Sequence, residues 1–100
     1  MKPPIRMTYA TALVLEALEQ GHAYGFDIID ATGLRSGTVY PLLRRLEEAG
    51  LVRSRWERVA DARRERRPPR KYYELRPAAA PVLEVARARF PAVAAIELAR

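Results

Sequence analysis

Three stretches in the first half of the chain carry apolar residues at the helical spacing of three and four positions. Residues 8–20 predict a first helix, with Thr8 placed to cap its start and Gly21 to end it. The expected buried face consists of Ala10, Leu13, Val14, Ala17 and Leu18. Residues 22–33 predict a short second helix. It contains Gly25. A glycine inside a helix lowers the stability of the helix by roughly 1 kcal/mol relative to alanine, so we infer that another helix crosses closely there.

The third helical stretch, "GLRSGTVYPLLRRLEEAGLV" at residues 33–52, has a proline among its apolar positions. Its expected buried face consists of Val39, Leu42, Leu43, Leu46 and Ala49. Gly50 ends the pattern. With Gly37 or Thr38 as the cap, Pro41 falls in the first turn, where amide hydrogens have no intrahelical partner. The pattern therefore predicts a late helix start, with a polar leading end.

After this helix the apolar period changes from helical spacing to alternation. Residues 51–59 alternate as in a half-exposed strand, and residues 71–75, "KYYEL", predict a second one. Between them, "ADARRERRPPR" has no apolar periodicity and indicates an exposed loop. Residues 77–100 are rich in alanine and predict a helix that prolines limit or kink.

Three helices, a strand, a basic loop and a strand are the order of a winged helix-turn-helix. The predicted fold is therefore mainly α with a small β-hairpin, plus a C-terminal helix. We expect residues 1–76 to form the DNA-binding domain and residues 77–100 a helical dimerisation segment of the same compact unit. In such folds the third helix enters the major groove and its leading end meets base edges.

Composition narrows the classes of protein further. A chain of 100 residues makes one domain with a modest core. It has no cysteine and a single histidine, His22, so disulfides, thiolate metal sites and imidazole zinc centres are not expected. His22 is interpreted as a residue of a helix start. No run approaches the roughly 20 apolar residues of a membrane span, and we expect a cytoplasmic, nucleoid-associated protein without cofactor or metal.

The net charge of +6 is concentrated in the middle of the chain. Residues 34–76 hold 13 basic and six acidic residues, whereas residues 1–33 are net acidic. A local basic excess is typical of a surface that binds a polyanion, here double-stranded DNA. The candidates on the recognition helix are Arg35, Ser36, Gly37, Thr38, Tyr40 and Arg44. The candidates in the wing are Arg63, Arg64, Arg66, Arg67, Arg70 and Lys71.

Several of these residues also have a purely structural interpretation. Ser36 and Thr38 can cap the helix as well as face DNA, and Tyr40 can pack at the helix–turn junction instead of contacting DNA. The lone Trp56 can stack on a ligand, but packing of a strand aromatic on the core is the commoner outcome. An enzyme is not expected, because no arrangement of nucleophile, base and carboxylate is present. The charge also leaves RNA binding open, although no exposed aromatic ladder supports it.

The segments "HAYGFDII", "TGLRSGTVYPLLRRLEEAGLV" and "RPPRKYYEL", with the tryptophan between them, resemble the PadR-like family of bacterial transcriptional repressors. The resemblance covers about residues 8–76. It implies a winged-helix homodimer that binds inverted-repeat operators, with small aromatic or drug-like effectors relieving repression. It also places Ser36, Gly37, Thr38 and Tyr40 on the recognition helix, and the returning wing strand at Arg70, Lys71 and Tyr72.

The family's C-terminal region builds the dimer and usually the effector pocket. Here it comprises about 24 residues with three prolines, and an Arg-Pro-Ala-Ala-Ala stretch follows the second strand where the family has Thr-x-x-Gly. The sequence assigns no residue to an effector pocket. The expected dimer interface consists of Leu83, Ala86, Phe90, Val93 and Leu13. The alternative hypothesis is a winged-helix protein-interaction module, such as an antitoxin or adaptor, without specific DNA binding.

Overall fold

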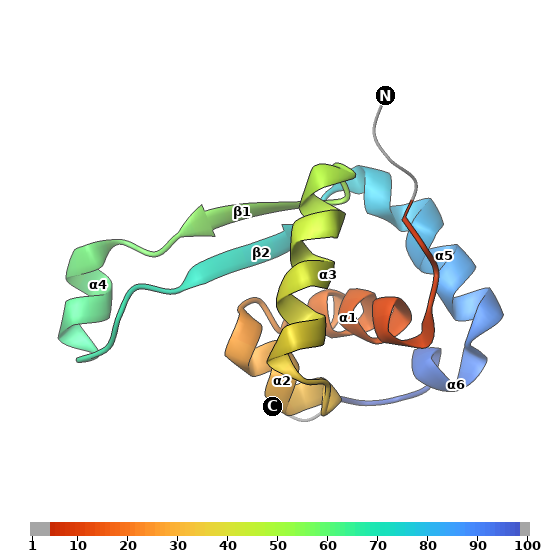
Figure 1. Cartoon of the computed structure of the whole chain (residues 1–100), viewed down its shortest axis with the longest axis horizontal. Helices are drawn as coiled ribbons and strands as arrows, with labels where there is room; N and C mark the ends of the chain where they lie inside the picture. The colour runs from red at the N-terminus through yellow and green to blue at the C-terminus, as the bar shows by residue number, and fades with distance from the viewer. Residues whose placement is uncertain (1–4, 99–100) are drawn as a thin grey trace.

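A computed structural model describes residues 5–98, and Figure 1 shows their arrangement. Three helices come first: α1 (Tyr9–Glu19), α2 (Gly25–Thr32) and α3 (Ser36–Glu48). A hairpin of β1 (Val52–Trp56) and β2 (Lys71–Leu75) follows, with α4 (Val59–Arg64) between its strands. A 3₁₀ turn, η1 (Pro77–Ala79), leads into α5 (Ala80–Arg89) and α6 (Pro91–Ala94). This order confirms the predicted winged helix-turn-helix fold.

Helix α1 forms the centre of the core. The Thr8 hydroxyl accepts a hydrogen bond from the Thr11 amide at 3.1 Å, so the predicted N-cap is confirmed. Gly21 follows the helix in the left-handed region at φ 96°. All residues from Thr11 to Leu18 are buried. The sequence predicts one buried face, but α2, α3, β2, α5 and α6 all pack against α1 and cover its whole circumference.

Helix α3 begins earlier than the sequence pattern predicts. Arg35, not Gly37 or Thr38, is the N-cap residue, and its carbonyl accepts the Val39 amide at 3.0 Å. Pro41 therefore lies inside the helix in its second turn, and the prediction of a first-turn proline is wrong. The missing amide would have bonded the Gly37 carbonyl. Because Gly37 is exposed, water can satisfy that carbonyl, and burial of Val39 holds the early turn on the core.

The hairpin extends away from the helices as a wing (Figure 1). Its strands pair antiparallel in register from Val52 opposite Leu75 to Trp56 opposite Lys71, which confirms both predicted strands. The first is shorter than the predicted range 51–59, because Val59 begins α4. The prediction of an irregular loop between the strands is wrong in part, because this segment contains the short helix α4. The only buried residue of α4 is Ala62, with 1% of its surface exposed. A helix of six residues is too short to reveal itself by apolar periodicity.

The C-terminal segment packs against α1 on the side opposite the wing (Figure 1). As predicted, the prolines divide it: Pro81 lies in the first turn of α5 and Pro91 starts α6. A bidentate ion pair fastens α5 to α1. The Arg87 Nε and Nη2 atoms donate to the two carboxylate oxygens of Glu16 at 3.2 and 2.9 Å. These hydrogen bonds raise the pKa of Arg87, and Glu16 is buried, with 2% of its surface exposed.

The residues predicted to form a dimer interface are mostly covered by the chain itself. Leu13, Leu83, Ala86 and Val93 are buried in the core of the single chain, and Phe90 is half-buried. They are covered because α5 and α6 fold back onto α1. Their part in a dimer stays a prediction. The larger exposed apolar side chains on this side of the molecule are those of Tyr9 and Val85.

Candidate nucleic-acid interface

The outer face of α3 is polar and exposed. Helical geometry places Gly37, Pro41 and Arg44 opposite the buried positions of the helix. Five of the predicted recognition residues are exposed and Thr38 is half-buried. The exposed five are Arg35, Ser36, Gly37, Tyr40 and Arg44. The glycine has open space around it, so the helix backbone can approach another molecule closely there.

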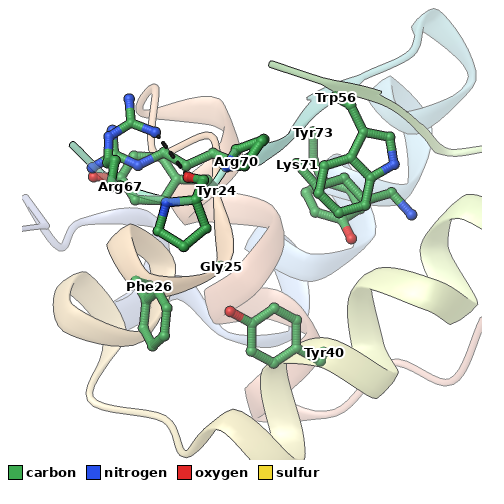
Figure 2. Close-up of a pocket in the computed structure, with 11 residues that line it drawn as sticks. Tyr24, Gly25, Phe26, Tyr40, Trp56, Arg67, Arg70, Lys71 and Tyr73 are labelled. Carbon is green, nitrogen blue, oxygen red and sulfur yellow. Dashed lines mark hydrogen bonds between the residues drawn. The ribbon is translucent and has the colours of Figure 1, made fainter. Parts of the chain in front are cut away.

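Tyr40 lies against the start of α2. A Cβ atom at Gly25 would overlap the far end of the Tyr40 ring. This confirms the inference that a neighbouring helix comes close at Gly25. Tyr40 nevertheless keeps 39% of its surface exposed, so packing at the junction and contact with DNA are compatible roles. Figure 2 shows the ring beside Gly25 and Phe26.

The substitution Gly25→Ala is expected to displace Tyr40 with little loss of stability. The overlapping atoms belong to the end of a partly exposed side chain that can rotate outward. Urea unfolding should therefore change by less than about 1 kcal/mol, while the tyrosine ring signals shift in NMR spectra. A loss of about 3 kcal/mol or more, on the order of a core overpacking defect, would mean that the ring cannot move.

Backbone hydrogen bonds dock the wing on the helices. The Tyr73 amide donates to the Ala23 carbonyl at 2.7 Å, and Tyr24 and Tyr72 form an isolated β-bridge. Tyr73 is buried, which raises its pKa. Tyr72 lies on the other face of the strand and is half-buried. The start of α2 thereby fixes the position of the wing relative to α3.

A ladder of two aromatic rings between two cations crosses the base of the wing. The Arg70 guanidinium lies 4.0 Å from the centre of the Tyr24 ring, which meets the Tyr72 ring edge to face at 5.8 Å. The Arg55 guanidinium lies 5.2 Å from the centre of the Tyr72 ring. Cation–π contacts of this kind hold a guanidinium in place without neutralising its charge. The ladder therefore presents two oriented positive charges.

Glu57 closes the wing loop. Its carboxylate accepts hydrogen bonds from the Arg67 Nη1 and Nη2 atoms at 2.5 and 2.8 Å and from the Arg70 amide at 3.1 Å. The hydrogen bonds from Arg67 are the main reason that the pKa of Glu57 falls from 4.5 to about 2. Arg67 is thus a structural residue of the wing, and its charge is already paired. No local pattern indicates this pairing, because ten positions separate the partners.

The Glu57 ion pair predicts a pH-dependent difference between the wild type and Glu57→Gln. A lowered carboxyl pKa contributes stability above pH 4.5, and this contribution is lost as the pH falls towards about 2. Urea unfolding should show the variant less stable at neutral pH, with the difference vanishing at low pH. The matched control is Glu74→Gln, which removes an exposed carboxylate from the same hairpin. A difference that stays constant with pH would mean that the charge of Glu57 is not its cause.

The six predicted wing cations separate into three groups. Arg63 and Arg66 are exposed and make no ion pair within residues 5–98. Arg64 is exposed but bonded to Asp61 in α4. The residues at the base of the wing, Arg67, Arg70 and Lys71, are half-buried. Lys71 lies 3.9 Å from a carboxylate oxygen of Glu47 and near the rings of Trp56 and Tyr73. The exposed charge is therefore greatest at the wing tip.

Trp56 does not pack on the core. With 65% of its surface exposed, it contradicts the expectation of a buried strand aromatic. It instead lines a pocket of about 540 Å³ between α2, α3 and the wing (Figure 2). The other lining residues are Tyr24, Gly25, Phe26, Tyr40, Arg67, Pro68, Pro69, Arg70, Lys71 and Tyr73. The sequence did not predict this pocket, because its walls come from four separate stretches of the chain.

Neither a metal site nor a membrane span is found over residues 5–98. This part of the chain has no group of three or more side chains that could ligate a metal ion. It also has no helix long and apolar enough to cross a membrane. His22 is buried, and its Nδ1 atom lies 3.0 Å from the Asp27 carboxylate. This contact agrees with the interpretation of His22 as a residue of a helix start.

Solved structures of similar architecture are transcription regulators. A PadR family transcription regulator from hypervirulent Clostridium difficile superposes with a TM-score of 0.71 at 25% identity, over 88% of this chain and 93% of that one. A PadR-like transcription factor from Bacteroides fragilis gives 0.64 at 28% identity, over 86% and 82%. A PadR family transcriptional regulator from Eggerthella lenta gives 0.62 at 29%, over 87% and 79%. Among curated proteins, none matches this chain.

The sequence model of the transcriptional regulator PadR-like family matches residues 14–84. This range runs from α1 to α5 and includes α3, the wing and the pocket. The family consists of transcription regulators, which agrees with the prediction that the chain is not an enzyme. The chain therefore belongs to the PadR-like family of DNA-binding, winged-helix transcriptional regulators.

Proposed function

We propose that the protein is a homodimeric repressor that acts in the cytoplasm on an inverted-repeat operator. The observation that carries this proposal is the exposed polar face of α3 next to a basic wing whose base is docked on α2. In a helix-turn-helix dimer, two recognition helices enter successive major grooves about 34–36 Å apart. Binding there blocks access of other proteins to the same DNA.

Base recognition is assigned to the exposed face of α3, from its N-cap residue Arg35 to Arg44. Arg35 and Arg44 are exposed and can each donate two hydrogen bonds to a guanine edge. Ser36 and Thr38 can donate to bases or phosphates, and the absence of a side chain at Gly37 allows close approach of the backbone. Tyr40, held against Gly25, is positioned for a phosphate or base at the edge of the groove.

Phosphate contacts are assigned to the wing. Arg63, Arg64 and Arg66 project from its tip, and the ladder at its base orients Arg70. Lys71 adds charge between the wing and α3. Each neutralised phosphate lowers the log–log slope of affinity against salt by about 0.9, so binding through several of these residues is strongly dependent on salt concentration.

Dimerisation is assigned to the C-terminal segment 77–100 and the adjoining start of the chain. Leu13, Leu83, Ala86 and Val93 support this surface from inside, and a partner would cover exposed apolar side chains above them. Tyr9 meets Phe90 edge to face at 5.8 Å, and Val85 is 52% exposed. This surface lies on the side opposite the wing (Figure 1), which leaves both wings of a dimer free for DNA.

The substitution Val85→Glu is expected to separate the dimer while the chain stays folded. The side chain is half exposed in the single chain, but a carboxylate facing its symmetry mate would be desolvated and repelled. Sedimentation should give a dimer for the wild type and a monomer for the variant, with unchanged helical circular dichroism. A variant that remains dimeric would place the interface elsewhere.

Selection of bound fragments from a random DNA pool tests the proposed function. The expected product is an inverted repeat with half-site centres about one helical turn apart. The oligomer mass should show two chains per bound duplex. No enrichment, together with no salt-dependent binding of any duplex, would favour the alternative of a protein-interaction module and overturn the proposal.

A further inference from the structure

The pocket between α2, α3 and the wing exposes aromatic rings on a basic part of the surface. Five aromatic side chains line it, and two of them are unusually exposed for large apolar rings: Phe26 at 70% and Trp56 at 65%. Tyr40 keeps 39% of its surface exposed. In Figure 2, Phe26 and Tyr40 lie across the pocket from Trp56. Large rings that stay exposed together mark a binding surface.

Cations lie among these rings. Three of the lining side chains are cations and none is a carboxylate. Arg67 is already paired with Glu57. Arg70 makes no ion pair in the described part of the chain, and its guanidinium lies 4.0 Å from the centre of the Tyr24 ring. The pocket therefore offers ring faces and an unneutralised positive charge to the same ligand.

The positive charge continues beyond the pocket on α3 and on the wing. Arg44 follows Tyr40 by one turn of α3 and is exposed. Arg63 and Arg66 are exposed at the wing tip. Ligand pockets enclose most of the surface of a small molecule, whereas the largest rings of this pocket stay mostly exposed. An open pocket between two basic surfaces is suited to a segment of a long polyanion.

Unpaired nucleotides combine the two features that the pocket selects, flat rings and negative charge. In a duplex the faces of each base are covered by its neighbours, so only unpaired bases can stack on Phe26 and Trp56. Such stacking contributes about 1–3 kcal/mol per base and tolerates any base sequence. Proteins that bind single strands combine these rings with a positively charged groove along the backbone. The chain belongs to a family of DNA-binding regulators, so the strand that we assign to the pocket is DNA.

We propose that this pocket binds an unpaired stretch of DNA, whose bases stack on Phe26 and Trp56 and whose phosphates contact Arg70. This activity goes beyond the proposed function, because neither ring is assigned to duplex DNA and no dimer is needed. Tyr40 and Arg70 line the pocket and are also assigned to the duplex. A single strand and the duplex therefore compete for the same face of the molecule.

Titration of the full chain with single strands tests the site itself. The probes are an oligothymidine of about ten nucleotides and an abasic deoxyribose-phosphate strand of the same length, and calorimetry measures their affinities. Trp56 is the only tryptophan of the chain, so quenching of its emission reports a base stacked in the pocket. We expect saturable quenching by oligothymidine and at least about tenfold weaker binding of the abasic strand. No binding of oligothymidine, binding without a change in emission, or equal affinity for the two strands would overturn the proposed site.

Variants separate binding of the single strand from binding of the duplex. Phe26→Ala should weaken oligothymidine binding by about tenfold and leave the affinity for a selected duplex within about twofold of the wild type. Arg35→Ala, which removes a residue assigned to base recognition, should do the reverse. The control Val59→Ala removes an exposed apolar side chain that does not line the pocket, and it should leave both affinities unchanged. If Phe26→Ala weakened both ligands equally, or neither, stacking on Phe26 would be refuted.

Two further comparisons test the identity of the strand and its competition with the duplex. Oligodeoxyuridine and oligouridine differ only in the 2′-hydroxyl, and tighter binding of oligouridine would overturn the assignment to DNA. Saturating oligothymidine should raise the apparent dissociation constant of a selected duplex at least about tenfold, and an unchanged constant would refute the competition. A chain that binds oligothymidine but no duplex would refute the proposed function while leaving the site intact. A chain that binds the duplex but no oligothymidine would overturn the site alone.

Discussion

Replacing Arg63 and Arg66 together by alanine is expected to weaken binding to every duplex by a similar factor. Both side chains are exposed at the wing tip and make no ion pair within the described residues, so they are available for phosphates, which carry no sequence information. Loss of two phosphate contacts should make the log–log salt slope about 1.8 less steep. Arg35→Ala should instead cost about 1–3 kcal/mol on the preferred sequence and little on others.

Fluorescence anisotropy with a selected duplex and a scrambled duplex, at several salt concentrations, measures both effects. The control is Arg76→Ala, which removes a positive charge from an exposed position after the wing. If the wing variant lost affinity only for the selected sequence, the wing would read bases. If Arg35→Ala lost affinity uniformly, base reading would not belong to the start of α3.

Arg87→Ala is expected to destabilise the fold by about 3 kcal/mol, because it leaves the Glu16 carboxylate buried without its partner. Water reaches Arg87, which is 42% exposed, and this places the cost at the lower end for a broken buried pair. Replacing both residues by methionine should restore most of the stability, since the desolvation penalty disappears together with the ion pair.

Urea unfolding of the two variants and the wild type checks this prediction. The free energy of unfolding should fall sharply in the single variant and recover in the double one. A loss below about 0.5 kcal/mol, the size typical of an exposed pair, would show that Arg87 does not fasten α5 to α1. A double variant as unstable as the single one would mean that packing, not charge, is what the arginine side chain provides.

Elements with several apolar repeats could be predicted from the sequence. The capped helix α1, the end of α3 at Gly50 and the strand Lys71–Leu75 lie where the pattern places them. Apolar burial at a fixed period is a local signal, since each buried side chain specifies its own face. The concentration of positive charge between residues 34 and 76 is also visible in the sequence, and it coincides with α3 and the wing.

Features that depend on distant partners could not be predicted. The pattern misplaced the start of α3, because Pro41 was expected to avoid the helix interior and the exposed Gly37 carbonyl makes it tolerable. Trp56 was expected in the core, yet its strand extends beyond the helices and leaves the ring exposed. The Glu57–Arg67 and Glu16–Arg87 pairs join residues 10 and 71 positions apart, and only the folded chain brings them together.

A titration of the wild-type chain with the selected inverted repeat, its isolated half-site and a scrambled duplex of equal length tests the central claim most directly. The repeat should bind two chains, at least about 10³-fold tighter than the scrambled duplex at physiological salt, and tighter than the half-site. Equal affinity for the repeat and the scrambled duplex, with one chain bound to each, would contradict sequence-specific binding by a dimer.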